Sequence, residues 1–112
     1  TVLGDAAEAR AILSVFGERC PPVSSTKSLT GHECWMAGAS EAAYTILMSN
    51  GEFLAPNRNF SASDKGLEAL NVVAQPTQAQ TRMVMSNSFG FGGTNACLVF
   101  DTSAFQSGAV HV

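Results

Sequence analysis

The sequence predicts an α/β fold in which helices cover a sheet. Two stretches of small and apolar residues have helical spacing, and several short runs bounded by glycine, proline or polar residues are typical of strands. Their alternation along 112 residues, enough for one domain, predicts a sheet covered by helices. Only 13% of the residues are charged, against about a quarter in an average soluble domain. We therefore expect much of the surface to be covered by further protein.

The first half of the chain is predicted to hold two helices and a strand. In residues 4–17, "GDAAEARAILSVFG", apolar residues recur at helical spacing; Asp5 is placed to cap this helix and Gly17 to end it. The Pro-Pro pair that follows excludes a helix, and residues 23–27 are predicted as a short strand. A second helix is expected over residues 37–48, where polar residues are few, so both of its faces should be covered.

The second half is predicted to be mainly loops and strands. Phe53, Leu54 and Phe60 are expected to anchor a loop over residues 49–66. The further expected segments are strands at 70–75 and 82–88 with a polar turn at 76–80 between them, a glycine turn at 89–95 and a strand at 96–101. We expect one domain over residues 1–101 and a tail over residues 102–112.

Charge and cysteine content exclude several classes of protein. The net charge is −3 with no run of Lys or Arg, so neither nucleic acid nor an anionic membrane is an expected partner. No apolar run approaches the roughly 20 residues of a membrane span, and no signal peptide is evident. Three cysteines, Cys20, Cys34 and Cys97, predict buried thiols in a reducing, cytoplasmic compartment, and the His-x-Cys spacing fits no common zinc pattern. The opening "TVLGD" lacks an initiator Met, so we expect part of a longer polypeptide.

The segment "SNSFGFGGTN" is a candidate ligand-binding loop. It is not a dinucleotide fingerprint, because Asn95 stands where a third glycine is needed and a strand follows instead of a helix. A wide hairpin is expected instead, with bare backbone at Gly90, Gly92 and Gly93 that can adopt unusual conformations and offer amides to an oxyanion. A purely structural turn is about equally compatible, although phenylalanines alternating with glycines favour a site.

A second candidate site contains Lys27, Thr30, His32 and Glu41. His32 lies in a loop entering a helix, where the helix dipole favours a neutral imidazole. A neutral imidazole can donate a hydrogen bond to negative charge developing on a carbonyl oxygen, and Lys27 could pair with Glu41 beside it. Spacing alone leaves a structural histidine as the commoner alternative.

Four blocks taken together, "TVLGD", "SSTKSLTGH", "AGASEA" and "NSFGFGGTN", resemble the C-terminal half of β-ketoacyl-acyl carrier protein synthases of the fatty-acid type I or II. Their order and spacing match from Thr1 to about Asp101. The resemblance implies the thiolase fold, in which two halves form five αβαβα layers with mixed sheets covered by helices, and a homodimer. This chain would supply the later half only.

The resemblance also implies roles for single residues. His32 would hydrogen-bond the malonyl thioester carbonyl and stabilise the enolate, with Lys27 ordering it and Glu41 as the partner of the lysine. Phe91 would act as a gate whose amide contributes to the oxyanion hole. The further implied residues are Phe89, Gly90, Gly92 and Gly93 around the gate, Thr1 and Thr30 at the substrate channel, and Glu41, Ser86 and Asn87 around a monovalent cation found in some members.

The implied activity is a decarboxylating condensation of malonyl-acyl carrier protein with an enzyme-bound acyl group, without a required cofactor. Acyl carrier protein and the other half of the same protein are the implied partners. Because the family's nucleophilic cysteine and first histidine lie in that other half, the fragment alone should be inactive. A non-catalytic chain-length-factor-like partner subunit is the alternative. Trp35 and Met36 depart from the family pattern, which has glycine and alanine there, and add volume beside His32.

Overall fold

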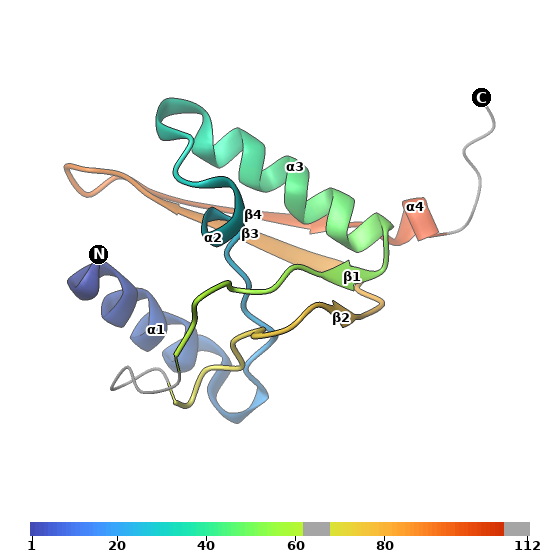
Figure 1. The fold of residues 1–112 in the computed structure, drawn as a ribbon, viewed down its shortest axis with the longest axis horizontal. Helices are drawn as coiled ribbons and strands as arrows, with labels where there is room; N and C mark the ends of the chain where they lie inside the picture. Colours follow the sequence, from blue (N-terminus) through green and yellow to red (C-terminus); the bar gives the residue numbers. More distant parts are fainter. Residues whose placement is uncertain (62–67, 107–112) are drawn as a thin grey trace.

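The computed structural model of the chain describes residues 1–61 and 68–106, and it combines helices with strands as the sequence predicts (Figure 1). The elements in chain order are α1 (Val2–Phe16), η1 (Gly17–Arg19), α2 (Lys27–Thr30), η2 (Cys34–Met36), α3 (Ala37–Asn50), β1 (Phe53–Leu54), β2 (Thr77–Gln78), β3 (Met83–Phe89), β4 (Asn95–Asp101) and α4 (Ser103–Gln106).

The first helix, α1, forms where apolar spacing predicts it and ends at Gly17 as expected. Gly17 has φ of 54°, a conformation that favours glycine, and its N–H donates to the carbonyl of Leu13. The prediction of Asp5 as the cap is wrong. Thr1 is the N-cap, because its hydroxyl oxygen accepts from the Gly4 N–H at 3.0 Å. Asp5 lies in the first turn, where a carboxylate interacts favourably with the helix dipole.

The strand predicted at residues 23–27 is wrong. Only Val23 pairs, in a parallel bridge with Val72, and Lys27 already begins α2. The intervening residues are serines and threonines, which have no apolar side chain to bury. The Ser24 hydroxyl donates to the Ala55 carbonyl at 2.6 Å, and the Ser25 N–H donates to Asn57 Oδ1 at 2.8 Å, so this segment is held through side-chain bonds and not through a strand ladder.

The strand predicted at residues 70–75 is likewise reduced to this one bridge, and the expected polar turn at 76–80 contains β2. β2 pairs antiparallel with β1, which lies in the segment expected to be loop and consists of the predicted anchors Phe53 and Leu54. Within the described residues, the predicted mixed sheet is therefore present as two antiparallel strand pairs and one parallel bridge.

The second long helix and the glycine hairpin confirm the sequence predictions. α3 begins at Ala37 as expected and runs two residues further, to Asn50. β3 and β4 pair antiparallel from Met83↔Asp101 to Phe89↔Asn95, with the glycine turn between them.

The hairpin lies between the two long helices, with α3 on one face and α1 on the other (Figure 1). Successive strand residues point to opposite faces. Ser88 faces α3, since its hydroxyl lies 3.2 Å from the position that a Cβ on Gly38 would occupy. Met85, Asn87 and Phe89 face α1 and line a largely apolar groove with it.

A buried cluster of hydroxyls joins the end of α3 to the hairpin. Ser49 Oγ lies 2.7 Å from Thr102 Oγ1 and accepts from the Thr81 hydroxyl at 2.8 Å, while the Thr102 N–H donates to the Arg82 carbonyl. Thr102 is 0% exposed and Ser49 is 1% exposed. The domain boundary expected after residue 101 thus falls within this junction. Residues 107–112 of the expected tail lie outside the described residues.

The apolar core of the described residues is small, and many large apolar side chains are exposed. The buried apolar side chains are Ala9, Ile12, Ala55 and Val73. The exposed ones lie on most elements, from α1 through α2, η2, α3 and β1 to the hairpin and its turn, and include Leu3, Val15, Trp35, Leu47, Leu98 and Val99. No helix within the described ranges is long and apolar enough to cross a bilayer.

Candidate functional site

The two candidate sites lie toward the same end of the hairpin. The segment that carries Lys27 and His32 leads into the start of α3, and the glycine turn projects from the hairpin at this end (Figure 1). This arrangement is fixed by a close approach between α3 and β3. Gly38, in the first turn of α3, lies against Ser88, near the end of β3. A side chain at position 38 would have to displace the Ser88 hydroxyl, so glycine allows the two elements to pack closely.

His32 is held by a hydrogen bond from the backbone that follows it. The Cys34 N–H donates to His32 Nδ1 at 2.9 Å. A ring nitrogen that accepts a hydrogen bond carries no proton, so the proton of the neutral imidazole resides on Nε2. The imidazole is exposed, and its Nε2–H is therefore a donor that can reach a ligand.

Lys27 and Glu41 form the ion pair that the sequence analysis expected. Lys27 Nζ contacts Glu41 Oε1, which brings the first residue of α2 against α3. The side chain of Glu41 is 17% exposed and that of Lys27 is 40% exposed, so the carboxylate is the more buried partner.

Glu8 of α1 joins this pair, although the sequence analysis did not select it. Burial raises the pKa of Glu8, while the Lys27 charge and a hydrogen bond with Asn87 act in the opposite direction. Four elements thus contribute to one charged cluster, defined here as Glu8, Lys27, Glu41 and Asn87. A sequence signal existed, because Asp5 and Glu8 stand three residues apart on one face of α1 in a chain with few charges.

The glycine turn has the left-handed backbone expected at only two of its three glycines. Gly92 and Gly93 have φ of 86° and 87°, and a Cβ on either would meet no atom within 4 Å. Gly90 is different: its φ is outside this range, and a Cβ there would lie 3.5 Å from the Thr94 carbonyl oxygen. The expectation of unusual backbone at Gly90 is therefore wrong. Its N–H donates to Thr94 and closes the loop.

Phe91 stands at the tip of this turn with its ring fully exposed, and Phe89 is exposed at the end of β3. Within the described residues, no acceptor is found for the Phe91 N–H. The turn therefore presents both an aromatic ring and an amide donor.

The two threonines predicted at a substrate channel have local hydrogen bonds. The Thr1 hydroxyl caps α1, and the Thr30 hydroxyl bonds the carbonyls of Thr26 and Gly31. Both residues are exposed.

The residues predicted around a monovalent cation do not converge as three side chains. Ser86 and Asn87 are neighbours on β3, so their side chains point to opposite faces of the hairpin. Glu41 Oε1 is already occupied by Lys27. A cation at this position would need backbone oxygens as well.

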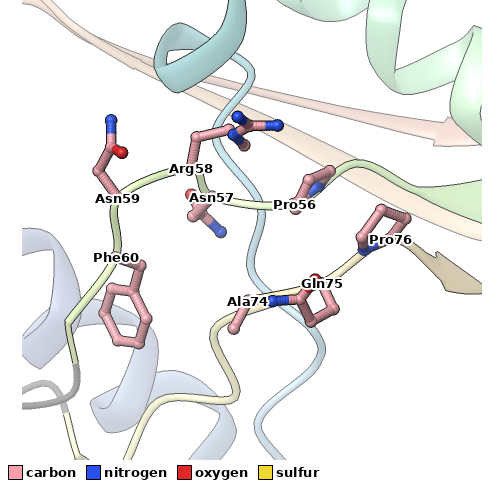
Figure 2. Close-up of a pocket in the computed structure, with 8 residues that line it drawn as sticks. All are labelled: Pro56, Asn57, Arg58, Asn59, Phe60, Ala74, Gln75 and Pro76. Carbon is pink, nitrogen blue, oxygen red and sulfur yellow. The ribbon is translucent and has the colours of Figure 1, made fainter.

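A separate polar pocket lies away from these residues, between segments 56–60 and 74–76 (Figure 2). Asn57 holds this junction together: its amide nitrogen donates to the carbonyls of Val23 and Val73, and its oxygen accepts from the Ser25 N–H. Figure 2 shows Arg58 and Asn59 directed away from the 74–76 segment. None of the predicted site residues lines this pocket.

Comparison with known proteins identifies similar chains. Residues 1–61 match the family model described as beta-ketoacyl synthase, C-terminal domain. The chain is 50% identical over 101 residues to 3-oxoacyl-[acyl-carrier-protein] synthase 1 of Haemophilus influenzae, which covers 89% of this chain and 25% of that protein. It is 48% identical over 99 residues to 3-oxoacyl-[acyl-carrier-protein] synthase 1 of Escherichia coli K12, covering 88% of this chain and 24% of the relative.

A third relative is 3-oxoacyl-[acyl-carrier-protein] synthase 2 of Coxiella burnetii, 42% identical over 101 residues, which covers 88% of this chain and 24% of that protein. The chain therefore spans about a quarter of the length of the curated relatives that it matches.

Proposed function

The chain belongs to the family of beta-ketoacyl synthase C-terminal domains, and from this premise we propose that it forms the C-terminal part of a condensing enzyme. The reaction joins an acyl group, held as a thioester on a cysteine elsewhere in the protein, to malonyl-acyl carrier protein. The malonyl group loses carbon dioxide, and its carbanion attacks the acyl thioester. This forms 3-oxoacyl-acyl carrier protein and releases the cysteine. The names of the matched relatives support this substrate class.

The single observation that carries the proposal is the hydrogen bond between the Cys34 N–H and His32 Nδ1. It leaves Nε2–H as the donor on an exposed imidazole. When malonyl thioester loses carbon dioxide, negative charge develops on the thioester carbonyl oxygen. A donor already oriented toward that oxygen stabilises the enolate more than the ground state, which is how such a group accelerates a reaction.

We propose that the charged cluster assists His32 electrostatically. Lys27 lies five residues before His32 and is paired with Glu41. A cation here would favour negative charge on the enolate nearby, and its carboxylate partners limit how far it can move. We propose that Glu8 shares this role with Glu41, since Lys27 and Glu41 both influence its charge.

We assign the glycine turn to the acyl group. The Phe91 N–H would donate to the thioester oxygen of the acyl-enzyme, and the rings of Phe91 and Phe89 would form an apolar gate for the acyl chain. Thr1 and Thr30 would contact the substrate carrier arm. The left-handed backbone at Gly92 and Gly93 supports this assignment, because it places the amide and the ring at the tip of the loop.

The remaining protein would cover the exposed apolar faces. The groove between α1 and the hairpin, with a volume of about 330 Å³, and the exposed face of α3 are the surfaces on which we expect the other half to pack. We propose that this completes a five-layer thiolase fold in a cytoplasmic homodimer. The reaction needs no cofactor, and a monovalent cation at Glu41, Ser86 and Asn87 stays a prediction on which no step depends.

The alternative is a non-catalytic partner subunit with a chain-length role. The bulky Trp35, 99% exposed beside His32, is the observation that favours it, because such a side chain could fill space that substrate would need. The Lys27–Glu41 pair and the oriented imidazole favour the enzyme, since a silent partner needs neither. The residue at the nucleophile position of the complete protein would decide between the two.

The test uses a hybrid synthase, in which this chain replaces the 99 matching residues of the Escherichia coli relative. His32→Ala should lower malonyl decarboxylation by about 10²–10³-fold, while transfer of the acyl group to the cysteine stays within about twofold. Glu18→Ala, a substitution on exposed η1, is the control and should change neither step. Equal loss of both steps with His32→Ala would contradict the proposed role. The 112-residue chain alone should form no acyl-enzyme and no 3-oxoacyl product, because it lacks the nucleophile.

A further inference from the structure

The four residues that connect His32 to α3 differ in how they contact the protein. Cys34, Trp35 and Met36 are exposed, whereas Glu33 is half-buried and directed toward α3. This segment carries the Cys34 N–H that orients the His32 ring. Its position must therefore be fixed by something other than apolar packing of its own side chains.

Glu33 provides that attachment through a hydrogen bond with Tyr44. The Tyr44 hydroxyl donates to Glu33 Oε1 at 2.8 Å, across a separation of 11 residues. Glu33 Oε2 is shielded from solvent and has no partner of regular hydrogen-bond geometry among the described residues. Hydrogen bonding by the Ser40 hydroxyl, followed by that of Tyr44, lowers the pKa of Glu33, so the carboxylate is charged at neutral pH. Hydrogen bonds to charged groups are among the stronger ones in proteins.

The backbone of this segment needs such a restraint. Cys34 has φ of 52°, a left-handed conformation that residues other than glycine adopt at a cost. The turn is closed by the Met36 N–H, which donates to the Glu33 carbonyl at 3.2 Å. The Cys34 N–H belongs to the peptide that joins Glu33 to Cys34, so its direction toward His32 Nδ1 is set by the Glu33 backbone, which has φ of −78° and ψ of 19°. The hydrogen bond from Tyr44 anchors the Glu33 side chain to α3 and so resists a rotation of the Glu33 backbone that would break the bond to His32.

We propose that Glu33 and Tyr44 are positioning residues that clamp the strained turn and thereby keep the His32 ring in its donor orientation. The inference rests on the proposed function, because it assigns these two side chains to the reaction that His32 would assist. They act through His32 and do not touch the reacting atoms. The clamp also explains how this chain tolerates Trp35 and Met36 next to the site: the turn is held from the Glu33 side, so the two large side chains can remain outside.

The first test measures the two half-reactions of the hybrid synthase. Tyr44→Phe keeps the ring and removes the donor, and Glu33→Ala removes the acceptor. Each should lower malonyl decarboxylation by about tenfold, the effect of one hydrogen bond to a charged group, with acyl transfer to the cysteine unchanged. Glu33→Gln, which retains an oxygen acceptor, should restore most of the rate. The double variant Glu33→Ala/Tyr44→Phe should be no slower than Glu33→Ala alone, because Glu33→Ala already removes the acceptor of the Tyr44 hydroxyl.

A second test does not depend on activity. Diethyl pyrocarbonate modifies an unprotonated imidazole nitrogen, and peptide mass spectrometry reports the modification rate of His32 alone. In the intact turn the Nδ1 lone pair is engaged by the Cys34 N–H, so His32 should react slowly. Tyr44→Phe and Glu33→Ala should speed its modification about tenfold, the change expected when one hydrogen bond is released. Glu18→Ala should leave the rate unchanged, and the same variants should not alter other histidines of the hybrid synthase.

The outcomes separate this inference from the proposed function. Faster modification of His32 with slower decarboxylation supports both. Faster modification in a hybrid that does not decarboxylate malonyl groups supports the clamp and contradicts the function. An unchanged modification rate overturns the clamp whatever the activity, as would losses that multiply in the double variant or a decarboxylation loss that follows the melting temperature alone.

Discussion

Alanine at Gly92 and alanine at Gly90 should have opposite effects, although the two glycines are separated by one residue. Gly92 has φ of 86°, in the left-handed range that L-residues avoid, whereas Gly90 has no such requirement. A Cβ on Gly92 would stand in open space, and one on Gly90 would make ordinary contact with Thr94 at 3.5 Å. Neither substitution creates a clash, so the backbone conformation alone separates them.

The size of the effect follows from this difference. An alanine forced into the left-handed region costs about 1–2 kcal/mol. An alanine at a compatible position stabilises by about 0.4–1 kcal/mol, because it reduces the freedom of the unfolded chain. The two variants should therefore differ by about 2 kcal/mol in the free energy of the native turn. In Gly92→Ala the cost of the left-handed alanine is relieved when the turn rearranges. That rearrangement displaces the amide and the ring of Phe91.

The assay compares both variants in the hybrid synthase. Gly92→Ala should slow acyl loading of the cysteine and condensation by about tenfold, in proportion to the lost population of the native turn. Gly90→Ala should retain both rates and a melting temperature at least equal to that of the parent. Equal damage from the two substitutions, or a Gly92→Ala variant with unchanged acyl loading, would refute the assignment of the turn.

Three further substitutions test the charged cluster and the hydroxyl junction through the melting temperature of the hybrid synthase. Burial raises the pKa of Glu8 above 4.5, so the stability linked to this group is present below that pH and is lost as the pH rises through the raised pKa. The melting temperature of Glu8→Gln should therefore exceed that of the parent by an amount that grows from acid to neutral pH. Lys27→Met should cost no more than about 1 kcal/mol, because its pair with Glu41 is partly exposed, yet slow decarboxylation beyond what that loss explains. Thr102→Val should cost about 1–3 kcal/mol and lower the melting temperature, because it removes a buried hydroxyl that bonds Ser49; an unchanged value would contradict the junction.

The sequence predicted elements whose cause is local. α1 and α3 have periodic small and apolar residues, and the β3–β4 hairpin has a glycine turn between two strand-forming runs, so each contains its own signal. The strand predictions at residues 23–27 and 70–75 were wrong because pairing there depends on a partner distant in sequence. Val23 and Val72 pair at a single bridge only. Propensity says little about whether such a contact extends into a strand.

The candidate site divides in the same way. Lys27 and Glu41 could be paired in advance because both flank a short segment that enters a helix. The contribution of Glu8 was missed: its place beside Asp5 on one face of α1 was visible in the sequence, but its partners Lys27 and Asn87 depend on how α1 packs near α2 and β3. The Glu33–Tyr44 hydrogen bond was missed for a different reason: it depends on the left-handed conformation of Cys34, a residue type that gives no indication of such a backbone.

The buried hydroxyls of Ser49, Thr81 and Thr102 have a consequence for how this protein could diversify. They fix the alignment of β3 with β4 from the end of the hairpin remote from Gly92. An insertion or deletion in the glycine turn would therefore not have to propagate along the strands, where a slip of one residue would exchange their two faces. Length variation can accumulate at the tip while α3 and its approach to the hairpin stay in place. The glycine turn could thus be remodelled without refolding the domain that bears it.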